Sequence, residues 1–412
     1  MRDFHATPHP LRILMLSHVF MPEVFGGGEQ QCLRLSKALL ARGLRPHILT
    51  SRSSTESPSE EIMEGVPVSR LWSSTQPQRG GRHIFSSFAW MRRVNRWIEK
   101  NQSDIDLLHC HHAKLNAWVG VRAARRIGVP SIVKVGSAGC NFDLYGLENK
   151  KFFYGKLAAR QIRQRADAFV GISAEMMQDL RDYGIEDDRC VHIPNGVALP
   201  VRDAAQTNGI RAKVRAQMQC HTGERVAVFA GRMVEQKNVG TLLRAMQILV
   251  RQGMTGRLIL LGDGALLPAL KDLADRLGLA DRVTFAGRVQ NVREFLIASD
   301  LFVLPALAEG LSNAVLEAMS EGLPPIVSDV SGNRDLVVPG QTGWVYGPAR
   351  DTEKLVAALN EAFTCSPQRL RHMAQANFAR VKRHYAIQSV AERYVELYQT
   401  LVQGAVGHDA AR

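Results

Sequence analysis

Short apolar runs rich in Val, Ile and Leu alternate with longer amphipathic segments, and this alternation constrains the fold more than any other feature of the sequence. A strand covered on both faces reads as a continuous apolar run, and the segment between two parallel strands is usually a helix. The alternation occurs twice and predicts two parallel sheets. The predicted strands of the first series are Arg12–Ser17, His47–Thr50, Val66–Leu71, Leu107–Cys110, Ser131–Val135, Ala168–Ile172 and Val191–Ile193. Those of the second are Val226–Gly231, Arg257–Leu261, Val283–Ala286, Leu301–Leu304, Pro325–Ser328 and Gly343–Tyr346.

A polar stretch, residues 196–223, separates the two series, and 412 residues suffice for two domains that each bury a core. We therefore predict an α/β fold of two facing Rossmann-like domains, residues 1–198 and 199–384, with an interdomain cleft. Because ligands bind at the carboxyl ends of the strands in such sheets, each wall of the cleft would hold its own substrate. The helical pattern of Ile387–Val402 predicts a C-terminal helix that crosses back, so residues 385–402 are assigned to the N-terminal domain.

The excess of positive charge is concentrated in one segment. Lys and Arg number 52 against 39 Asp and Glu, a net charge of +13, and residues 79–165 alone contribute +12. Such a segment is compatible with nucleic acid, an anionic membrane surface or a polyanionic substrate. The charge alone does not choose among these partners.

The cysteines and the apolar runs predict a cytoplasmic protein. The six cysteines are scattered without a Cys-x-x-Cys pair, so neither a zinc site nor a disulfide framework is predicted. The apolar run Leu11–Val19 leads directly into a glycine cluster without a cleavage site, which argues against a signal peptide. No run reaches the roughly 18 apolar residues that a membrane span needs.

Two loops carry residues suited to binding anions. Gly26 and Gly27 precede a helical pattern after the first strand, where backbone N–H groups and a helix N-terminus can approach an anion; a flexible turn is the alternative. After the first strand of the second series come Gly231, Arg232 and Lys237. An Arg and a Lys at this edge can converge on one diphosphate, although each alone is more often a solvated surface charge.

A third segment contains two glutamates. Glu309 follows a predicted strand, and Glu317 lies on a predicted helix, Ser312–Glu321. Seven residues separate the two glutamates, so they need not form the carboxylate pair of a hydrolase, whose members must face each other across one bond. Separate roles for the two glutamates fit this spacing better. Ser312 and Asn313 would offer N–H groups at the start of this helix.

Taken in order, these motifs resemble the family 4 retaining glycosyltransferases of the GT-B fold, over residues 12–402. The motifs are the glycine loop before Glu29, the His-x-His ending at His111, Ser173, Pro194-Asn195-Gly196, Gly231-Arg232 with Lys237, Gly262-Asp263-Gly264, and Glu309 to Glu317. The resemblance implies transfer of a sugar from a nucleotide-diphosphate donor, with retention at the anomeric carbon and no metal ion or other cofactor.

The resemblance also assigns roles. Arg232 and Lys237 match the diphosphate clamp, Glu317 matches the glutamate that binds the ribose, and Glu309 matches the one that faces the donor sugar. His111 matches a histidine near the donor sugar and the acceptor hydroxyl, although a lone histidine is more often structural. The remaining donor-binding candidates are Gly26, Gly27, Gly231, Gly310, Leu311, Ser312 and Asn313.

The chain departs from the family pattern at three places. Gly136 and Ser137 stand where family members commonly carry His-Gly, the SGG-like loop reads Ser331 to Asp335, and Ala198 replaces a common Asp. The first and last departures concern acceptor or sugar contacts more than the diphosphate clamp.

Two motifs are discounted. Asp104-Ile105-Asp106 is an Asp-x-Asp, which holds a metal ion in another glycosyltransferase fold, but it precedes a strand at the wrong edge of the sheet, so no metal site is predicted. Gly262-Asp263-Gly264 lacks the third glycine and the distal acidic residue of a dinucleotide loop.

The basic segment contains two parts with interleaved aromatic residues. His83–Lys100 reads as an interfacial helix for anionic lipid, or as a helix whose apolar face packs on the first sheet while its arginines are solvated. The second part, Lys150–Arg165, lies where acceptors bind in this fold, and no nucleic-acid motif accompanies it. The acceptor-binding candidates are Gly136, Ser137, Lys150, Lys151 and Tyr154.

We therefore predict a retaining hexosyltransferase that transfers a sugar to a saccharide or polyisoprenyl-linked acceptor in cell-surface or exopolysaccharide synthesis. It would be cytoplasmic, with peripheral attachment to the inner face of the membrane as a hypothesis. The alternatives are a nucleotide-sugar epimerase or hydrolase of the same fold and a nucleotide-sugar-binding protein without catalysis. Donor turnover that requires an added acceptor would separate transfer from the alternatives.

Overall fold

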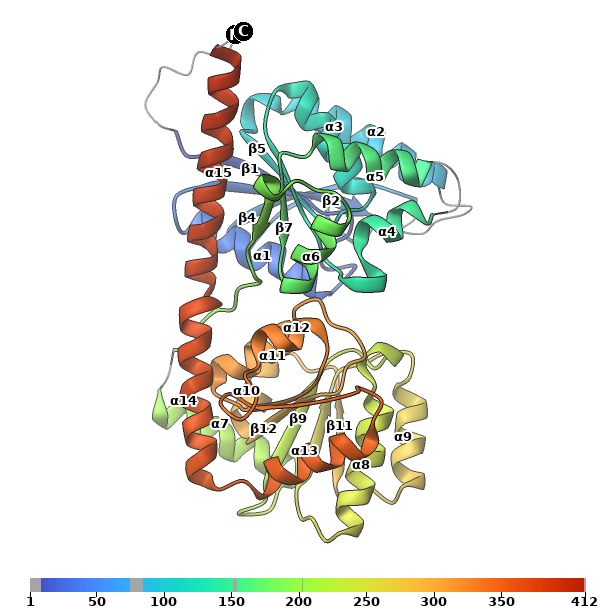
Figure 1. Cartoon of the computed structure of the whole chain (residues 1–412), viewed down its shortest axis with the longest axis vertical. Helices are drawn as coiled ribbons and strands as arrows, with labels where there is room; N and C mark the ends of the chain where they lie inside the picture. The colour runs from blue at the N-terminus through green and yellow to red at the C-terminus, as the bar shows by residue number, and fades with distance from the viewer. Residues whose placement is uncertain (1–8, 75–83, 151–153, 202, 411–412) are drawn as a thin grey trace. The chain divides into compact units, whose positions relative to one another are not determined.

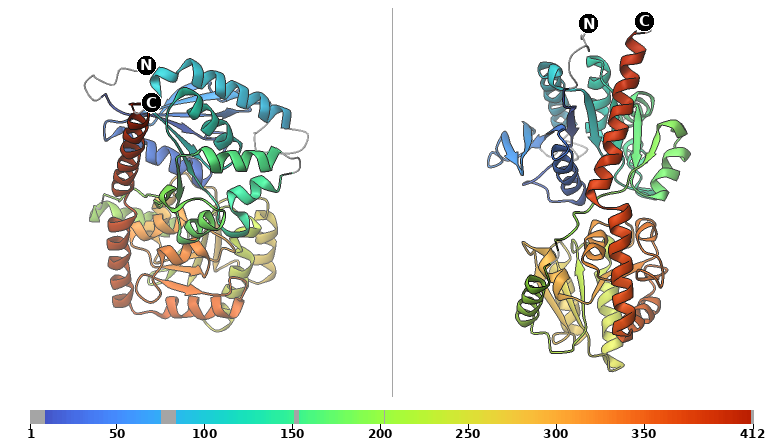
Figure 2. Two further views of the ribbon diagram at one scale, coloured as in Figure 1. Left: turned by 45° about the horizontal axis from the view of Figure 1, so that its top comes forward. Right: turned by 90° about the vertical axis from the view of Figure 1, so that its left-hand side faces the viewer.

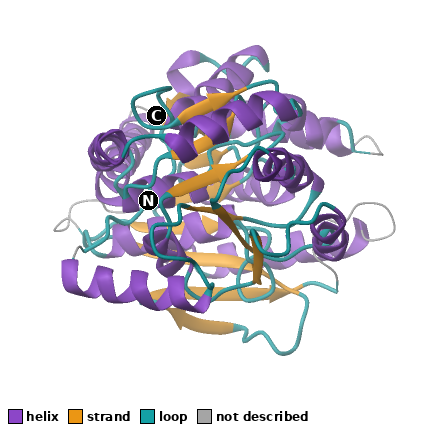
Figure 3. Ribbon diagram, turned by 90° about the horizontal axis from the view of Figure 1, so that it is seen from below, coloured by secondary structure: helices purple, strands orange, loops and turns teal. Residues whose placement is uncertain are grey.

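The structure is a computed structural model that describes residues 9–74, 84–150, 154–201 and 203–410 (Figure 1). The described chain divides into two compact units, one formed by the residues up to Gly196 and from Ile387 onward, the other by Val197–Ala386. The sequence places these boundaries at 198/199 and 384/385. Each unit contains a sheet with helices on both faces (Figures 2 and 3).

The first unit is built on an eight-stranded sheet in the order β3-β4-β2-β1-β5-β6-β7-β8. Every neighbouring pair is parallel except β3 and β4. Its strands are β1 (Arg12–Leu16), β2 (Arg45–Arg52), β3 (Glu60–Met63), β4 (Val66–Trp72), β5 (Leu107–His111), β6 (Ser131–Lys134), β7 (Ala168–Gly171) and β8 (Cys190–His192). Its helices are α1 (Gly27–Leu40), α2 (Ile84–Lys100), η2 (Gln102–Asp104), α3 (Leu115–Ile127), η3 (Gly139–Asn141), α4 (Asp143–Glu148), α5 (Tyr154–Arg165), α6 (Ala174–Asp182), η4 (Asp187–Arg189) and α15 (Ile387–Ala410).

The second unit is built on a six-stranded, fully parallel sheet in the order β11-β10-β9-β12-β13-β14. Its strands are β9 (Val226–Ala230), β10 (Arg257–Leu261), β11 (Val283–Gly287), β12 (Leu301–Leu304), β13 (Pro325–Ser328) and β14 (Trp344–Tyr346). Its helices are α7 (Ala204–Gln217), η5 (Glu235–Lys237), α8 (Val239–Arg251), α9 (Leu267–Arg276), α10 (Val292–Ala298), α11 (Asn313–Glu321), α12 (Ser331–Leu336), α13 (Thr352–Thr364) and α14 (Pro367–His384).

The predicted strands are all present, which confirms the two parallel sheets. Central strands such as β9 and β12 are buried at every position, as continuous apolar runs covered by helices should be. The sequence missed β3, an antiparallel edge strand whose polar residues give no apolar run. It also gave no element for the polar stretch that contains α7.

The C-terminal helix α15 belongs to the first unit, as the sequence predicts (Figure 1). Its Tyr394 and Tyr398 are fully buried in a cluster that includes Cys32 and Leu35 of α1. Arg42 Nη2, just after α1, donates to the carbonyl oxygen of Gln388 at 2.6 Å. Within the described residues, the structure has no helix long and apolar enough to cross a membrane.

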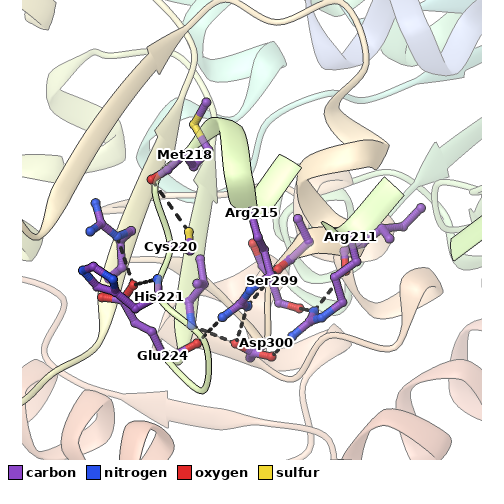
Figure 4. Close-up of polar contacts among 12 residues, drawn as sticks. Arg211, Arg215, Met218, Cys220, His221, Glu224, Ser299 and Asp300 are labelled. Atoms are coloured by element: carbon purple, nitrogen blue, oxygen red, sulfur yellow. Dashed lines mark hydrogen bonds and ion pairs between the residues drawn. The ribbon is translucent and has the colours of Figure 1, made fainter. Parts of the chain in front are cut away.

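Helix α7 is fixed to the second sheet by arginines that surround Asp300, the residue before β12 (Figure 4). Arg211 Nη1 donates to the Ser299 carbonyl oxygen at 3.0 Å, and Arg211 and Arg215 both pair with the Asp300 carboxylate. Asp300 Oδ2 also accepts the backbone N–H of Val226 at 2.8 Å. The carboxylate therefore joins α7, β9 and β12 at the amino ends of the strands.

Replacing Asp300 by alanine is expected to lower the free energy of unfolding by about 3 kcal/mol, because two partly buried guanidinium groups lose their counter-charge and the Val226 N–H loses its acceptor. Urea denaturation would measure the change. Glu361→Ala is the control, since its pair with Arg369 is exposed and should contribute at most about 0.5 kcal/mol. Equal losses for the two variants would show that the Asp300 network contributes no more to stability than an exposed ion pair.

Candidate functional site

In each sheet the strand order reverses at one position, and in doubly wound folds ligands bind at the carboxyl ends of the strands on either side of it. In the second unit, β10 pairs with one side of β9 and β12 with the other. In the first unit, β2 pairs with one side of β1 and β5 with the other. The residues that follow β9, β12, β1 and β5 are therefore the ones best placed to meet a ligand.

Lys237 and Glu309, which the sequence places in separate loops, form an ion pair beside the β9/β12 reversal. Lys237 ends η5, Glu309 lies in the loop after β12, and Lys237 Nζ donates to Glu309 Oε1. Their side chains are 16% and 10% exposed. The two loops are joined by hydrogen bonds of 2.8 Å from Leu307 N–H to the Gln236 carbonyl oxygen and from Gln236 Nε2 to the Ala308 carbonyl oxygen.

Gly231 and Arg232 directly follow β9, and the Arg232 side chain is exposed. Arg232 lies on the same loop as Lys237, so the structure brings the two predicted cations to one end of β9. One of these cations is paired with a carboxylate and the other is open to solvent. Two cations at this edge, one exposed and one paired with a carboxylate, are thus available to bind an anionic group.

The Gly262-Asp263-Gly264 segment supports this loop from behind. A Cβ atom on Gly262 would lie 1.9 Å from the Gly231 carbonyl oxygen, and one on Gly264 would lie 2.6 Å from the Met233 carbonyl oxygen. Both glycines have positive φ, 128° and 155°. The backbone approach explains these glycines without a bound dinucleotide.

Helix α11 begins beside Glu309. Ser312 is its N-cap, and the Ser312 hydroxyl oxygen accepts the backbone N–H of Val315 at 3.3 Å. The predicted donor-binding residues Gly310, Leu311, Ser312 and Asn313 thus form the turn into the helix. Glu317 lies farther along α11 with its side chain partly buried.

The loop after β13 also packs on this turn. A Cβ atom on Gly332 would lie 2.4 Å from the Gly310 carbonyl oxygen and 2.8 Å from Leu311 Cα. Gly332 N–H donates to the Glu309 carbonyl oxygen at 3.2 Å. The segment Ser331 to Asp335, which differs from the family pattern, therefore contacts the Glu309 turn through Gly332.

The glycine loop of the first unit forms the start of α1. Gly26 is the N-cap and Gly27 the first helical residue, directly after the loop that follows β1. A Cβ atom on Gly26 would lie 2.2 Å from Glu29 Oε2, so the Glu29 side chain folds back onto the N-cap. The loop has the predicted position between a strand and a helix.

His111, the last residue of β5, is buried. Its ring stacks on His109 with 4.4 Å between centroids, as expected for residues that share one face of a strand. Burial lowers the pKa of His111 well below its ordinary value, and the charges of His109 and Lys134 act in the same direction. The neutral imidazole of His111 is 3% exposed and lies inside the first unit.

The next residue, His112, lies at the carboxyl end of β5 and was not among the residues predicted from the sequence. Its backbone is left-handed, with φ of 70°, and its side chain is 21% exposed. His112 Nδ1 lies 3.7 Å from Oδ2 of the buried Asp143. The sequence signal was a second histidine just beyond the predicted strand Leu107–Cys110, and nothing in the pattern revealed the left-handed turn.

The acceptor-binding candidates lie apart along the first unit. Gly136 and Ser137 follow β6 and are partly buried, whereas Tyr154 is buried with its ring 6.0 Å from that of Phe88. Burial lowers the pKa of Lys150, and the nearby Lys114 lowers it further. Lys151 lies outside the described residues.

The Asp-x-Asp motif lies before β5, at the edge opposite the carboxyl ends. Asp106 Oδ1 pairs with Arg12 Nη2 at 2.8 Å, and Asp104 pairs with Arg12 Nη1 at 3.4 Å. Asp106 Oδ2 also accepts the backbone N–H of Arg12 at 2.8 Å. The two carboxylates therefore fix the start of β1 to that of β5.

Comparisons with known proteins identify the family of both halves of the chain. Residues 26–196 match the family described as Glycosyl transferase 4-like domain, and residues 211–380 match Glycosyl transferases group 1. The D-inositol 3-phosphate glycosyltransferase of Nocardia farcinica is 32% identical over 333 residues, which cover 77% of this chain and 73% of that protein.

Two solved structures share the fold. Sucrose-phosphate synthase from Thermosynechococcus elongatus has a TM-score of 0.79 at 22% identity and covers 96% of this chain and 100% of its own. Anabaena Alr3699/HepE in complex with UDP and glucose has a TM-score of 0.76 at 18% identity, with 95% and 100% covered. By its matched domains, this sequence identity and this fold, the chain is a glycosyltransferase and belongs to family 4, with the GT-B fold.

Proposed function

We propose that this glycosyltransferase is a retaining, metal-independent hexosyltransferase that moves a sugar from a nucleotide-diphosphate sugar to a saccharide or lipid-linked acceptor in cell-surface or exopolysaccharide synthesis. The observation that carries the proposal is the Lys237–Glu309 ion pair at the β9/β12 reversal, with Arg232 on the same loop as Lys237. Retention rests on the resemblance to family 4 and would be tested by the anomeric configuration of the product.

The second unit would bind the donor. Arg232 can hold a phosphate bidentately and Lys237 as a point charge, while the amino end of α11 adds N–H groups and a positive dipole. As the bond from the sugar to the diphosphate breaks, negative charge grows on the leaving group, and fixed cations stabilise that transition state. Glu309 would face the donor sugar, and Glu317 would accept hydrogen bonds from the ribose.

Arg232 and Lys237 would supply the positive charge that a divalent metal ion supplies in other sugar transferases. Donor turnover is therefore expected to be unchanged by EDTA. A loss of turnover with EDTA that Mg²⁺ or Mn²⁺ restores would contradict this part of the proposal.

The first unit would bind the acceptor, with the Gly26–Gly27 loop near the phosphates. Gly136, Ser137, Lys150, Lys151 and Tyr154 remain acceptor candidates by their position after β6 and before or at the start of α5. Because Tyr154 is buried against Phe88, it would affect acceptor binding by supporting neighbouring residues and not by direct contact.

The basic segment supports a lipid-linked acceptor at an anionic membrane surface. Helix α2 buries Trp90 and Ile98 but leaves Phe85 81% exposed, with Arg92 and Arg93 also exposed. One face of α2 is thus buried, as expected for a helix that packs on the first sheet. Another face exposes an aromatic residue and two arginines, as expected for a helix at a membrane surface. The protein would then be cytoplasmic and peripheral at the inner face of the membrane.

Flotation with vesicles containing phosphatidylglycerol should test the membrane proposal. We expect the protein to float at low salt and to be released as salt screens the basic residues. Phe85→Ser with Arg92→Ser and Arg93→Ser should abolish flotation and lower the thermal midpoint only slightly, because all three side chains are exposed and the hydrogen bond that Arg93 Nη1 donates to the Trp72 carbonyl oxygen is exposed as well. A protein that stays in the bottom fraction at low salt would rule out this surface as a membrane site.

The donor can be identified by thermal stabilisation with UDP-glucose, GDP-glucose and ADP-glucose, since a ligand that binds the folded state raises its midpoint. UDP-glucose is the first probe because the similar Anabaena protein was solved with UDP and glucose. Turnover of the stabilising donor only with an added acceptor would support transfer. Conversion without an acceptor would favour an epimerase or hydrolase, and binding without turnover a binding protein.

A further inference from the structure

His112 occupies the position in the first unit that corresponds to the β9/β12 reversal in the second. It follows β5, the strand that pairs with β1 at the point where the strand order reverses. Its left-handed backbone is held by a hydrogen bond of 2.8 Å from His112 N–H to the Lys134 carbonyl oxygen. A left-handed backbone is costly for a residue with a side chain, and such strained residues are concentrated at functional sites. The turn therefore makes His112 a candidate functional residue.

The imidazole ring fills the space between two glycines. A Cβ atom on Gly136 would lie 1.9 Å from His112 Nδ1, and one on Gly28, in the first turn of α1, would lie 2.4 Å from His112 Nε2. Neither position can carry a side chain while the ring is in place. The ring therefore occupies the space that a side chain at position 136 would otherwise fill.

A buried carboxylate lies beside one edge of the ring. Asp143 is 2% exposed in its side chain, and its Oδ2 accepts the N–H of Gly136 at 2.9 Å and the N–H of Ala113 at 3.0 Å. Burial raises the pKa of Asp143, but His112, Lys114 and the Gly136 N–H outweigh it and bring the pKa to about 2. The Asp143 carboxylate, anchored by two backbone N–H groups, is thus a fixed negative charge beside Nδ1 of the ring.

Exposure distinguishes His112 from the other histidines at this edge. His18 and His111 are 2% and 3% exposed, and the His18 ring meets the His112 ring edge-on at 6.1 Å. The side chain of His112 is 21% exposed. With Nδ1 beside Asp143, Nε2 can donate to or accept from a hydroxyl group, which itself can do either.

We infer that His112 is a catalytic residue that contacts a hydroxyl group of the transferred sugar, and that Asp143 is the residue that positions its ring. The inference rests on the proposed transfer of a sugar from a nucleotide-diphosphate donor. His111 remains the candidate that the sequence pattern favours, and the variants below separate the two histidines.

The first experiment tests the geometry without substrate. Gly136→Ala should lower the thermal midpoint by about 5 °C in the native chain, because the new methyl group overlaps the His112 ring. In a His112→Ala background the same change should lower the midpoint by less than about 1 °C. Equal losses in both backgrounds would overturn the placement of the ring.

The second experiment tests catalysis with UDP-glucose, and with GDP-glucose and ADP-glucose if the wild type does not turn over the first. His112→Ala should lower kcat about 100-fold and change KM for the donor less than about threefold. His112→Ala with Gly136→His, which supplies an imidazole from the opposite side, should regain at least about tenfold. His47→Asn is the control, since His47 on β2 bonds Ser69 at 2.9 Å and should keep wild-type kcat.

Added imidazole should raise the rate of His112→Gly and not that of the wild type. Asp143→Asn should lower kcat in the native chain and have no further effect on kcat in the His112→Ala background, because a positioning residue acts only through the ring. A kcat of His112→Ala within threefold of wild type, or a loss for His111→Ala alone, would overturn the inference. Failure of the wild type on all three donors would instead refute the proposed donor class, and the inference would fall with it.

Discussion

Lys237→Ala is expected to lower kcat/KM for the donor by about 30- to 1000-fold, which corresponds to about 2–4 kcal/mol of lost transition-state stabilisation. Lys237 lies at the carboxyl end of β9 in ion-pair contact with Glu309. Its removal has two effects, because the leaving diphosphate loses a cation and the Glu309 carboxylate loses its partner. Both effects disfavour the build-up of negative charge at this edge.

Initial rates with the donor found by thermal stabilisation would measure this loss. Lys271→Ala is the matched control, because Lys271 is an exposed lysine of α9 in the same unit and should leave the rate unchanged. Arg232→Ala should lose a similar amount, since its exposed side chain is the second proposed phosphate ligand. A double variant of Arg232 and Lys237 with nearly wild-type activity would refute the donor site.

Glu309→Gln separates binding from catalysis at the same pair. In the unliganded protein Lys237 is neutralised by Glu309, so a phosphate must compete with the carboxylate for the ammonium group. We expect the variant to bind UDP several-fold more tightly by calorimetry, because Lys237 is released. Its kcat should fall, because the group proposed to face the donor sugar has lost its charge. Weaker UDP binding would show that Glu309 positions Lys237 and does not compete for it.

Much of the fold follows from the sequence, because strands covered on both faces must be continuous apolar runs. The same rule explains the omission of β3, whose polar edge position requires no such run. Lys237 and Glu309 were each predicted from their place after a strand. That they pair required the strand order, because β9 and β12 are adjacent although β10 and β11 come between them in the chain.

The position of His112 illustrates a different limit of sequence reasoning. Alternation along β5 places His109 and His111 on one face, and the resemblance of this His-x-His to the family motif made His111 the candidate. The left-handed turn at His112 breaks the alternation and brings the next ring to the end of the strand. A single non-glycine residue of this kind leaves no periodic signal. The two glycines around the ring are informative only once the neighbouring strands are known.

The glycines behind the Arg232 loop give the second large effect. Gly262 has φ of 128°, and a Cβ atom added there would lie 1.9 Å from the Gly231 carbonyl oxygen, so alanine meets both backbone strain and overlap with backbone atoms. We expect Gly262→Ala to lower the free energy of unfolding by about 3–5 kcal/mol. The loop that carries Arg232 would have to shift to admit the methyl group, so donor affinity should fall as well.

Two other glycines of the same unit separate strain from overlap. Gly278 has φ of 69° with no atom within 4 Å of an added Cβ, so Gly278→Ala should lose only about 1 kcal/mol. Gly209, within α7, is equally open but has no positive φ, and Gly209→Ala should gain about 0.5–1 kcal/mol from helix propensity. Urea denaturation of the three variants should thus give a gain, a small loss and a large loss. If the free energy of unfolding of Gly262→Ala fell no further than that of Gly278→Ala, the close backbone contact between Gly262 and Gly231 would not determine the position of the Arg232 loop.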